Sequence, residues 1–384
     1  MTVRVSKPAF NLREKITELD KPTGIKGSEL LKSNTIQEAR DIIGAGRKNL
    51  IINGNFDFWQ RGTSFSSINS MRYTADRWLQ YAAGSSTITA TQQPFDVGQT
   101  EVPGNPKYYY RMDNTPDPNT AWMELFYRIE DVTRFSGVPV TLSFWMRANK
   151  PQIGEDEIRL IQNFGTSGLG ASSAVTLRGP LFDIGTSWKK YEFTFDLPSI
   201  TGKTIRENNF LQIHLVRITN AVAADTHYDL AQFQLEYGRT ATPFEQRSLG
   251  EELALCQRYA YRLGGLGKQY QCVATGFIGH NGSTDTGKVI VHLPTTMRTN
   301  PSISVIGTNA FWVHTGGAET GTSDMDAEFG APWNSASSGN QVWLDFARTG
   351  GGSPNRGVAC VVYTKSNNQG ELLFDAELPS TYSP

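Results

Sequence analysis

At 384 residues, the chain is long enough for two or three domains that each bury a core of their own. Its 38% hydrophobic and 19% charged content fits a folded protein, and its 37 glycines favour turn-rich β structure. The formal net charge of −1 provides no overall attraction to nucleic acid or to an anionic membrane. No apolar run approaches the roughly 20 residues that span a bilayer. Nucleic-acid binding and membrane insertion are therefore not expected.

Residues 1–48 are predicted to form an arm with two short helices. Capping patterns open both helices, at Asn11 and at Thr35. Helices of about nine residues are unstable alone in water, so their apolar stripes need a partner, either neighbouring subunits or another protein. The side chains expected to dock are Phe10, Leu12, Ile16 and Leu19. The first residues lack the apolar core of a signal peptide, so synthesis in the cytoplasm is expected.

Residues 49–248 are predicted to form a jelly-roll-type β-sandwich. Short segments alternate apolar with polar residues, and clusters of Pro, Gly, Asn and Asp separate them. No helix is long enough for a parallel crossover. The predicted strands are residues 50–52, 86–91, 140–146, 158–161, 191–195, 211–216 and 228–235.

Two phrases enclose this module, NLIINGNF at residues 49–56 and FQLEYG at residues 233–238. Asn53-Gly54 is a turn dipeptide that suits positive φ, and Phe56 can then enter the core. We expect the two phrases to lie side by side, so that the ends of the domain are close together.

A linking helix is predicted over residues 249–264, starting at a capping box that Ser248 opens. Its apolar face carries Leu253, Cys256 and Tyr259. Together with the arm helices, this face predicts a homotrimer, on the reasoning that one chain cannot bury these stripes.

Residues 265–384 are predicted to form a second, smaller β-sandwich, so the chain as a whole is expected to be all-β. The stretch 315–340, rich in Gly, Ser and Ala, is expected to be a long exposed loop. The predicted strands are residues 270–276, 288–293, 303–306, 341–346, 358–363 and 371–377.

Several stretches resemble a family of bacteriophage structural proteins, the tail fibres and related virion appendages. They are residues 33–44 (SNTIQEARDIIG), 46–56 (GRKNLIINGNF), 59–63 (WQRGT), 73–78 (YTADRW), 235–248 (LEYGRTATPFEQRS) and 251–259 (EELALCQRY). The resemblance covers about residues 1–262. It implies a trimeric, non-enzymatic appendage with sandwiches like those of carbohydrate-binding modules, and it implies no catalytic residues.

Residues that could carry chemistry are few. The five histidines have no metal-ligand spacing, and neither do the cysteines, which are expected to be free, buried thiols. Four carboxylates, Asp156, Glu157, Asp324 and Asp326, could pair for glycoside hydrolysis, which needs two carboxyl groups about 5–10 Å apart. Oxygens around Asp113 and Asp117 leave a calcium site open. No catalytic residue, metal site or cofactor is predicted.

Sugar binding is favoured over a hydrolytic or calcium site, because aromatic rings can stack on the C–H faces of a sugar. The candidates are Tyr109 and Trp122 in the sandwich, and Trp312, His314 and Trp333 in the distal domain. Core packing is the competing explanation for each aromatic residue, and Trp333 is expected to be exposed on its loop.

The sequence thus predicts a trimeric tail fibre on the virion surface. The arm would attach it to other virion proteins, and the distal domains would contact glycans of the host surface. The alternative is a head fibre or capsid decoration protein with a purely structural role. A polysaccharide depolymerase is a more distant alternative.

Overall fold

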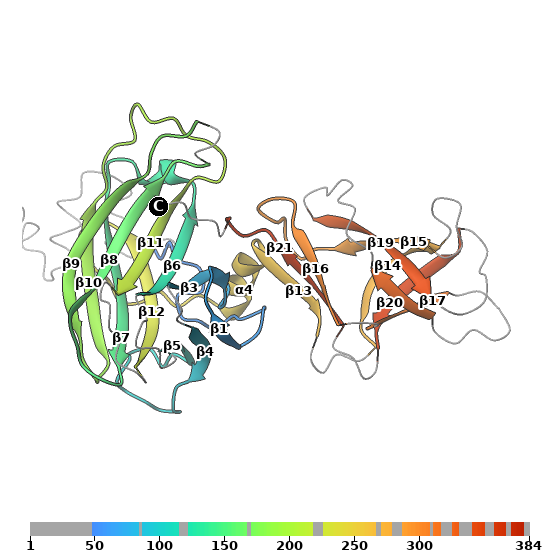
Figure 1. Cartoon of the computed structure of the whole chain (residues 1–384), viewed down its shortest axis with the longest axis horizontal. Coiled ribbons are helices and arrows are strands. Elements are labelled where there is room, and N and C mark those ends of the chain that lie inside the picture. Colours follow the sequence, from blue (N-terminus) through green and yellow to red (C-terminus); the bar gives the residue numbers. More distant parts are fainter. Residues whose placement is uncertain are drawn as a thin grey trace, which may run out of the picture.

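The computed structural model describes residues 48–83, 87–114, 122–166, 170–217, 226–265, 270–278, 286–307, 310–315, 325–329, 340–349, 357–365 and 370–379. These residues form two lobes, a large sandwich and a smaller distal barrel, with a short helix and a three-stranded sheet between them (Figure 1). The all-β prediction is confirmed. The predicted arm at residues 1–48, with Phe10, Leu12, Ile16 and Leu19, lies outside the described residues except for Lys48.

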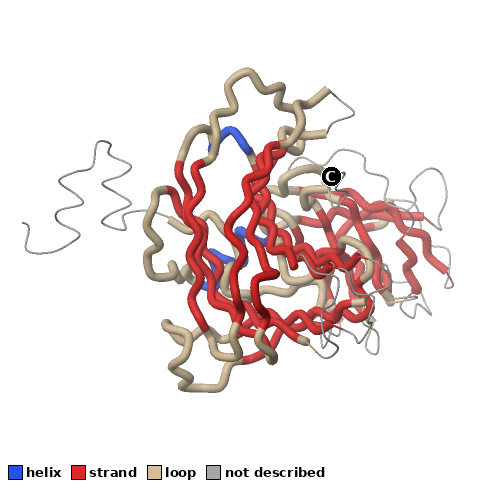
Figure 2. Tube along the Cα trace, turned by 60° about the vertical axis from the view of Figure 1, so that its left-hand side comes forward, coloured by secondary structure: helices blue, strands red, loops and turns tan. Residues whose placement is uncertain are grey.

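The sandwich consists of two six-stranded antiparallel sheets. The first sheet, in spatial order, is β1 (Ser64–Ile68), β4 (Ile88–Pro94), β5 (Tyr108–Asn114), β12 (His227–Tyr237), β7 (Pro139–Ala148) and β10 (Lys189–Asp196). The second is β2 (Arg72–Tyr73), β3 (Trp78–Ala83), β6 (Trp122–Glu130), β11 (Phe210–Arg217), β8 (Gln152–Asn163) and β9 (Val175–Ile184). A 3₁₀ turn, η1 (Val132–Phe135), follows β6. The longer strands run alongside one another through the height of this lobe (Figure 2).

Alternation along the strands sends one set of side chains into the space between the sheets. Phe56, Trp78 and Phe233 meet there, with Phe56 and Trp78 ring centroids 5.0 Å apart and Trp78 and Phe233 centroids 4.9 Å apart. Phe144 stacks on Phe233 at 4.5 Å. The core is therefore continuous from the first framing phrase to the last strand.

The two framing phrases lie side by side, as predicted. The Leu50 amide donates to the Leu235 carbonyl at 2.9 Å, and the Phe233 amide donates to the Gly54 carbonyl at 2.8 Å. The prediction of a strand at residues 50–52 is wrong, because this stretch turns at Asn53 (φ 57°) and pairs with β12 at isolated points.

Helix α4 (Leu249–Gln257) leaves the sandwich, and the Ser248 side chain caps it by accepting a hydrogen bond from the Glu251 amide. The helix is shorter than the predicted 249–264. Residues 260–264 instead form strand β13 (Ala260–Gly264), since Tyr261 and Leu263 alternate onto the distal core.

The distal part has a three-stranded sheet and a closed six-stranded barrel, where the sequence predicts a smaller sandwich. The sheet is β13, β21 (Glu371–Asp375) and β16 (Ser302–Ile306). The barrel is β14 (Cys272–Ile278), β15 (Thr286–His292), β19 (Gln341–Thr349), β18 (Met325–Phe329), β17 (Phe311–Thr315) and β20 (Ala359–Thr364). Alternation cannot separate the two architectures, because closure depends on β20 pairing with both β14 and β17. Strand β18 also corrects the prediction that residues 315–340 are all loop.

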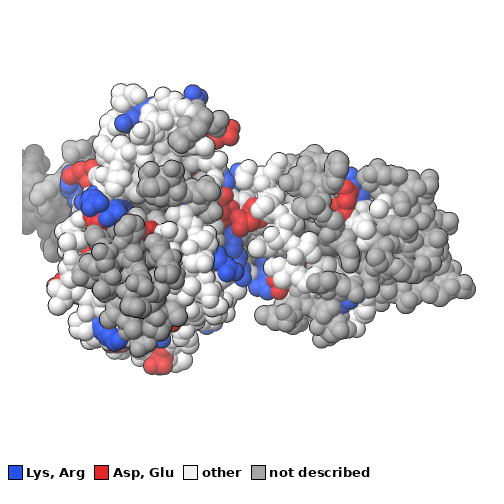
Figure 3. Space-filling model, viewed as in Figure 1, with Lys and Arg blue, Asp and Glu red and all other residues white. Residues whose placement is uncertain are grey.

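Charged side chains gather where the sandwich meets the distal part (Figure 3). Arg77 and Glu377 form an ion pair that is buried on both sides, and Arg61 reaches Asp375 at 2.8 Å. The chain that follows β21 returns to the sandwich, where the Tyr73 hydroxyl donates to the Leu378 carbonyl at 2.9 Å. These bonds hold the two lobes in a fixed relation. Among the described residues, no helix is long and apolar enough to cross a membrane.

Candidate functional site

The predicted sugar-binding residues fall in different places. Trp333 lies outside the described residues; Trp122 begins β6, but its side chain is not described. Tyr109 is 8% exposed, so the prediction that it offers a free stacking face is wrong. Trp312 and His314 lie on β17, on the outer side of the barrel.

An aromatic patch forms around Trp312 on the distal barrel; we define this patch as Tyr270, Trp312 and Tyr363. The ring centroids of Trp312 and Tyr363 lie 5.8 Å apart, edge to face. Tyr270 is 6.0 Å from Trp312 and 6.4 Å from Tyr363. Tyr270 is 57% exposed, and the other two rings are half-buried.

Strand alternation places the rings of the patch outside the barrel. Phe311 and Val313 point into the barrel core, so the intervening Trp312 points out. In the register of β17 and β20, Trp312 is opposite Tyr363. Cross-strand aromatic pairs of this kind stabilise a sheet even where one face is open to water.

Tyr270 joins the patch through an unusual backbone conformation. It precedes β14 with φ 55°, a left-handed conformation that is costly for a residue with a bulky side chain. Its amide donates to the Thr364 carbonyl at 3.1 Å, which holds the residue against β20. An exposed ring kept in a strained conformation is a feature typical of functional sites.

Polar groups surround the patch. The Lys365 ammonium lies 5.7 Å from the centre of the Trp312 ring, and His314 is exposed two residues further along β17. Lys365 itself is only 7% exposed. The patch therefore combines apolar ring faces with a cation and an imidazole, which suits a ligand that has both apolar and hydroxyl surfaces.

Tyr109 belongs to a second aromatic cluster, on the outer face of the first sandwich sheet. Its ring meets Phe95 at 4.9 Å and Trp188 at 5.6 Å, in both cases edge to face. The chain between β4 and β5 covers this cluster, with Val102 buried against it. Tyr109 therefore serves in packing, which was the alternative to sugar binding for each aromatic candidate.

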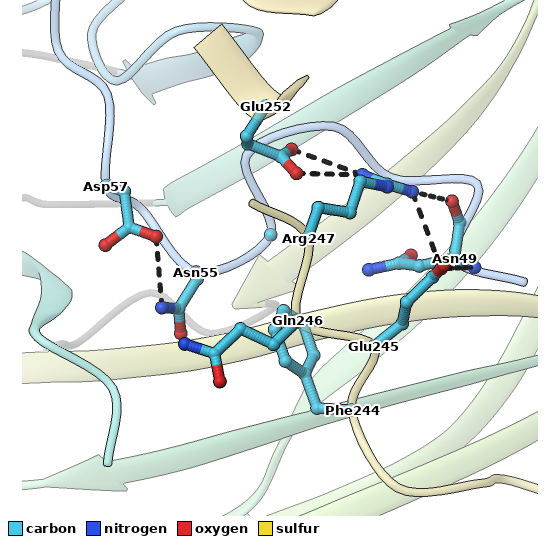
Figure 4. Close-up of a pocket in the computed structure, with 9 residues that line it drawn as sticks. Asn49, Asn55, Asp57, Phe244, Glu245, Gln246, Arg247 and Glu252 are labelled. Carbon is cyan, nitrogen blue, oxygen red and sulfur yellow. Dashed lines mark hydrogen bonds and ion pairs between the residues drawn. The ribbon is translucent and has the colours of Figure 1, made fainter. Parts of the chain in front are cut away.

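The pocket between the framing phrases is structural (Figure 4). Arg247 lies at its centre and donates to the Ile51 carbonyl at 3.0 Å, to the Asn49 carbonyl, and to the Glu252 carboxylate at 3.1 Å. The Glu245 carboxylate accepts from the Asn49 amide at 2.6 Å. The enclosed space is about 10 Å³, room for about one water molecule.

Two of the residues predicted for the trimer helix are buried within one chain. Cys256 is 0% exposed and Tyr259 is 5% exposed, whereas Leu253 is half-buried. The premise that one chain cannot bury this face is therefore wrong for Cys256 and Tyr259. Tyr259 packs under the Arg77 guanidinium, 3.5 Å from the ring centre, which is a contact of the joint between the lobes.

Asp156 and Glu157, two of the carboxylates considered for glycoside hydrolysis, are not paired with each other in the structure. Asp156 and Glu157 are consecutive on β8, so they point to opposite faces of the sheet. Glu157 is bound by Arg159 at 2.7 Å. Within the described ranges, no three His, Cys, Asp or Glu side chains gather as metal ligands. Cys256 and Cys360 are buried free thiols, but Cys272 is exposed, against expectation.

Sequence reasoning identified Trp312 and missed Tyr270 and Tyr363. Tyr363 could have been found from the alternation of Val362 inward and Tyr363 outward on β20. No local signal marks Tyr270, because its position depends on the bond to Thr364, which is distant in the sequence.

No protein-family model and no curated protein matches the chain. Among solved structures, the fold is similar to the Family 11 carbohydrate-binding module from Clostridium thermocellum, at 11% identity, with 46% of this chain and 96% of that chain covered and a TM-score of 0.28. It is also similar to the CBM22-1 xylan-binding domain from Paenibacillus barcinonensis Xyn10C (15% identity, 46% of this chain and 94% of that chain, TM-score 0.28). A further likeness is to tailspike protein 4 of bacteriophage CBA120, at 13% identity over 50% of this chain and 21% of that chain, with a TM-score of 0.29. These likenesses concern the fold of about half of the chain and do not identify a ligand.

Proposed function

We propose that this protein is a non-enzymatic bacteriophage appendage that binds a surface saccharide through the aromatic patch of its distal barrel. The observation that carries the proposal is the exposure of Tyr270 beside Trp312 and Tyr363. In the sandwich, by comparison, the large aromatic residues of the core are buried.

The chemistry of the patch supports a sugar as ligand. A pyranose ring presents C–H groups on one face and hydroxyls at its edge, so it gains from apolar contact and from hydrogen bonding together. The Tyr270 and Trp312 rings, at an interplanar angle of 34°, form a shallow V rather than a flat wall. The Lys365 ammonium, 5.7 Å from the centre of the Trp312 ring, adds positive charge next to the patch, and His314 is exposed two residues further along β17.

The arrangement of the lobes supports an appendage. The sandwich and the barrel lie at opposite ends of the molecule (Figure 1), and the described chain begins on the sandwich, where the Lys48 ammonium donates to the Thr242 hydroxyl at 2.5 Å. An arm at residues 1–48 would then attach the protein to the virion, and the barrel would face outward. Two stretches that resemble tail fibres meet beside helix α4 where the structure describes them, at residues 48–63 and 235–259: the Asn53 amide donates to the Glu252 carboxylate, and Arg247 donates to the Ile51 carbonyl at 3.0 Å.

Saccharide binding is tested by applying the full-length protein to an array of bacterial surface glycans and measuring the affinity for the best ligand. We expect Trp312→Ala to weaken binding at least about tenfold, because the stacking of a nucleic-acid base on one aromatic ring contributes on the order of 1–3 kcal/mol, and the C–H face of a sugar loses a contact of the same kind. Phe277→Ala is the matched control, since Phe277 is 37% exposed on the same barrel but lies outside the patch. Equal affinity of the Trp312 and Phe277 variants, or no glycan bound at all, would refute the proposal.

The virion role is tested separately by deleting residues 1–45. We expect the truncated protein to fold but to be absent from assembled particles. A truncated protein that still joins the particle would show that the arm is not the anchor, and a monomer mass of the full-length protein in light scattering at micromolar concentration would contradict the predicted trimer. Density of whole particles would distinguish a tail fibre from a head fibre.

A further inference from the structure

A row of charged side chains crosses the outer face of the first sandwich sheet. In the strand register, Asp229 of β12 lies opposite Arg111 of β5 on one side and Arg147 of β7 on the other. The Asp229 carboxylate is 0% exposed, whereas the Arg111 and Arg147 side chains are 23% and 29% exposed. Both guanidiniums therefore reach solvent, and the carboxylate between them does not.

Asp229 binds both arginines through well-formed hydrogen bonds. Arg111 donates Nε to Oδ1 at 2.7 Å and Nη2 to Oδ2 at 2.9 Å. Arg147 donates Nε to Oδ2 at 2.9 Å. An arginine has five N–H donors. The Tyr109 hydroxyl accepts from Nη2 of Arg111 at 3.2 Å, and Arg147 uses its Nε for the bond to Asp229. Arg147 therefore keeps donor capacity on its Nη nitrogens for a further acceptor.

The charge of Arg147 is the less compensated of the two. A second carboxylate, Asp113, lies in the next row on β5 and faces His227 at 3.7 Å. Burial, and next to it the charge of Arg111, lowers the pKa of His227, so this imidazole adds no positive charge at neutral pH. Strand β12 separates β5 from β7, and the row of Asp113 lies two residues along the sheet from the row of Arg147. The two backbone positions are therefore about 12 Å apart.

Arg147 is also held in place. Its guanidinium lies 4.9 Å from the centre of the Trp188 ring, in the aromatic cluster that contains Tyr109. A guanidinium fixed by both a carboxylate and an aromatic ring loses little freedom when it binds a further group.

An apolar ring lies on the same face of β7 as Arg147. Trp145 is two residues earlier on the strand, at the edge of the cluster that contains Tyr109, and packing against that cluster leaves it half-buried with part of its surface open to solvent. It lies opposite Ala231 on one neighbouring strand and Lys190 on the other. A ligand that contacts Arg147 can therefore place an apolar face on Trp145 at the same time.

We propose that this face binds a saccharide that bears a carboxylate, such as a uronic acid residue. The carboxylate accepts hydrogen bonds from the Nη atoms of Arg147, and the sugar ring packs on Trp145. Guanidinium and carboxylate match in geometry and charge, which favours this class over neutral sugars. This site is separate from the patch on the distal barrel, and it does not depend on that patch.

The experiment compares two probes, a short oligogalacturonate and its methyl ester, by calorimetric titration of the full-length protein. The two probes have the same rings and differ in charge. We expect the acid to bind and the ester to bind at least about tenfold more weakly, since hydrogen bonds between charged groups contribute on the order of 1.5–3 kcal/mol. Binding of the acid should weaken as salt is raised.

Three variants locate the site. Arg147→Gln should lose at least about tenfold in affinity for the acid, and it should remain folded because Arg111 still neutralises Asp229. Arg239→Gln is the matched control, since Arg239 is an exposed arginine of the same lobe that pairs with Asp196. Trp312→Ala should leave this binding unchanged, which separates it from the patch on the barrel. Equal binding of acid and ester, or an Arg147→Gln variant that binds like Arg239→Gln, would overturn the proposal.

Discussion

In the sandwich, Phe56, Trp78 and Phe233 pack together between the two sheets and are at most 1% exposed. In the distal barrel, Tyr270 is 57% exposed and shares its patch with the half-buried rings of Trp312 and Tyr363. The two parts are built from the same kind of strand, with the same alternation. The difference shows that the sandwich uses its aromatic residues mainly for stability, and that the barrel presents some of them to solvent.

At the joint between the two parts, buried ion pairs take the place of aromatic packing. Arg77 and Glu377 are buried with their charges, and Arg61 and Asp76 lie beside them. Burying charge costs free energy, so such pairs contribute less to stability than apolar packing of the same volume. They do require one relative placement of the lobes, because a shifted lobe would leave a buried charge without its partner.

The largest expected effect comes from breaking this joint. Glu377→Leu removes the carboxylate and leaves Arg77 buried without it, so we expect a loss of about 3–5 kcal/mol in the free energy of unfolding. Urea unfolding followed by tryptophan fluorescence should then show the lobes unfolding separately. The double variant Glu377→Leu, Arg77→Met removes both charges and should recover much of the loss. A single variant as stable as the double variant would show that the pair does not couple the lobes.

Glycine substitutions compare the cores of the two lobes. A Cβ at Gly54 would overlap the Phe233 carbonyl oxygen in the sandwich, and a Cβ at Gly276 would overlap the Lys288 carbonyl oxygen in the barrel. Backbone cannot move aside easily, so we expect each alanine variant to lose about 3 kcal/mol, at the upper end for overpacking. Calorimetry should assign each loss to its own lobe. Gly250→Ala, in helix α4 with no atom within 4 Å of its Cβ, is the control and should not destabilise.

The pH dependence of stability should reveal the buried Asp76. Burial raises the pKa of Asp76 from 3.8 to about 6, so the folded state binds the proton more tightly than the unfolded chain. This contribution to stability is fully present below about pH 4 and is lost as the pH rises through 6. Between pH 7 and pH 5, we expect the wild type to gain roughly 1 kcal/mol relative to Asp76→Asn. Parallel pH profiles of the two proteins would contradict the raised pKa.

The smallest effect on stability is expected in the aromatic patch. Tyr270→Gly removes the exposed ring and suits the left-handed φ of 55°, so stability should stay equal or rise by up to about 1 kcal/mol. Saccharide binding should be lost in the same variant. Thermal unfolding and glycan titration together check this combination. A clear loss of stability would mean that Tyr270 is part of the packing and is not held in place for a ligand.

Much of the fold follows from local patterns. Alternation and turn residues predict the all-β class, and the two framing phrases are side by side, as expected from Asn53-Gly54 and the last strand. Gly54 itself is needed for the close approach to the Phe233 carbonyl, and the positive φ belongs to Asn53. A turn dipeptide indicates that the chain reverses, but it does not indicate which distant segment of the chain will pack against the turn.

The candidate sites were less accessible to prediction. Trp312 was a candidate only as an aromatic residue of the distal domain, and the structure adds that it lies between two inward residues on β17. The prediction for Tyr109 is wrong because the loop that contains Phe95 and Val102 packs over it. The burial of Cys256 and Tyr259 likewise depends on the sandwich, which lies outside the helix pattern.

Strand character and helix caps follow from the sequence alone, because they depend on residues within a few positions of one another. The meeting of the framing phrases is long-range and was expected on a different ground, that the ends of a domain lie close together. The tertiary structure adds the closure of the distal strands into a barrel, the position of Tyr270 and Tyr363 beside Trp312, and the sharing of Asp229 by Arg147 and Arg111. Those arrangements depend on hydrogen-bonded register between strands far apart in the chain, and a pattern with a period of two residues carries no information about which strands will be neighbours.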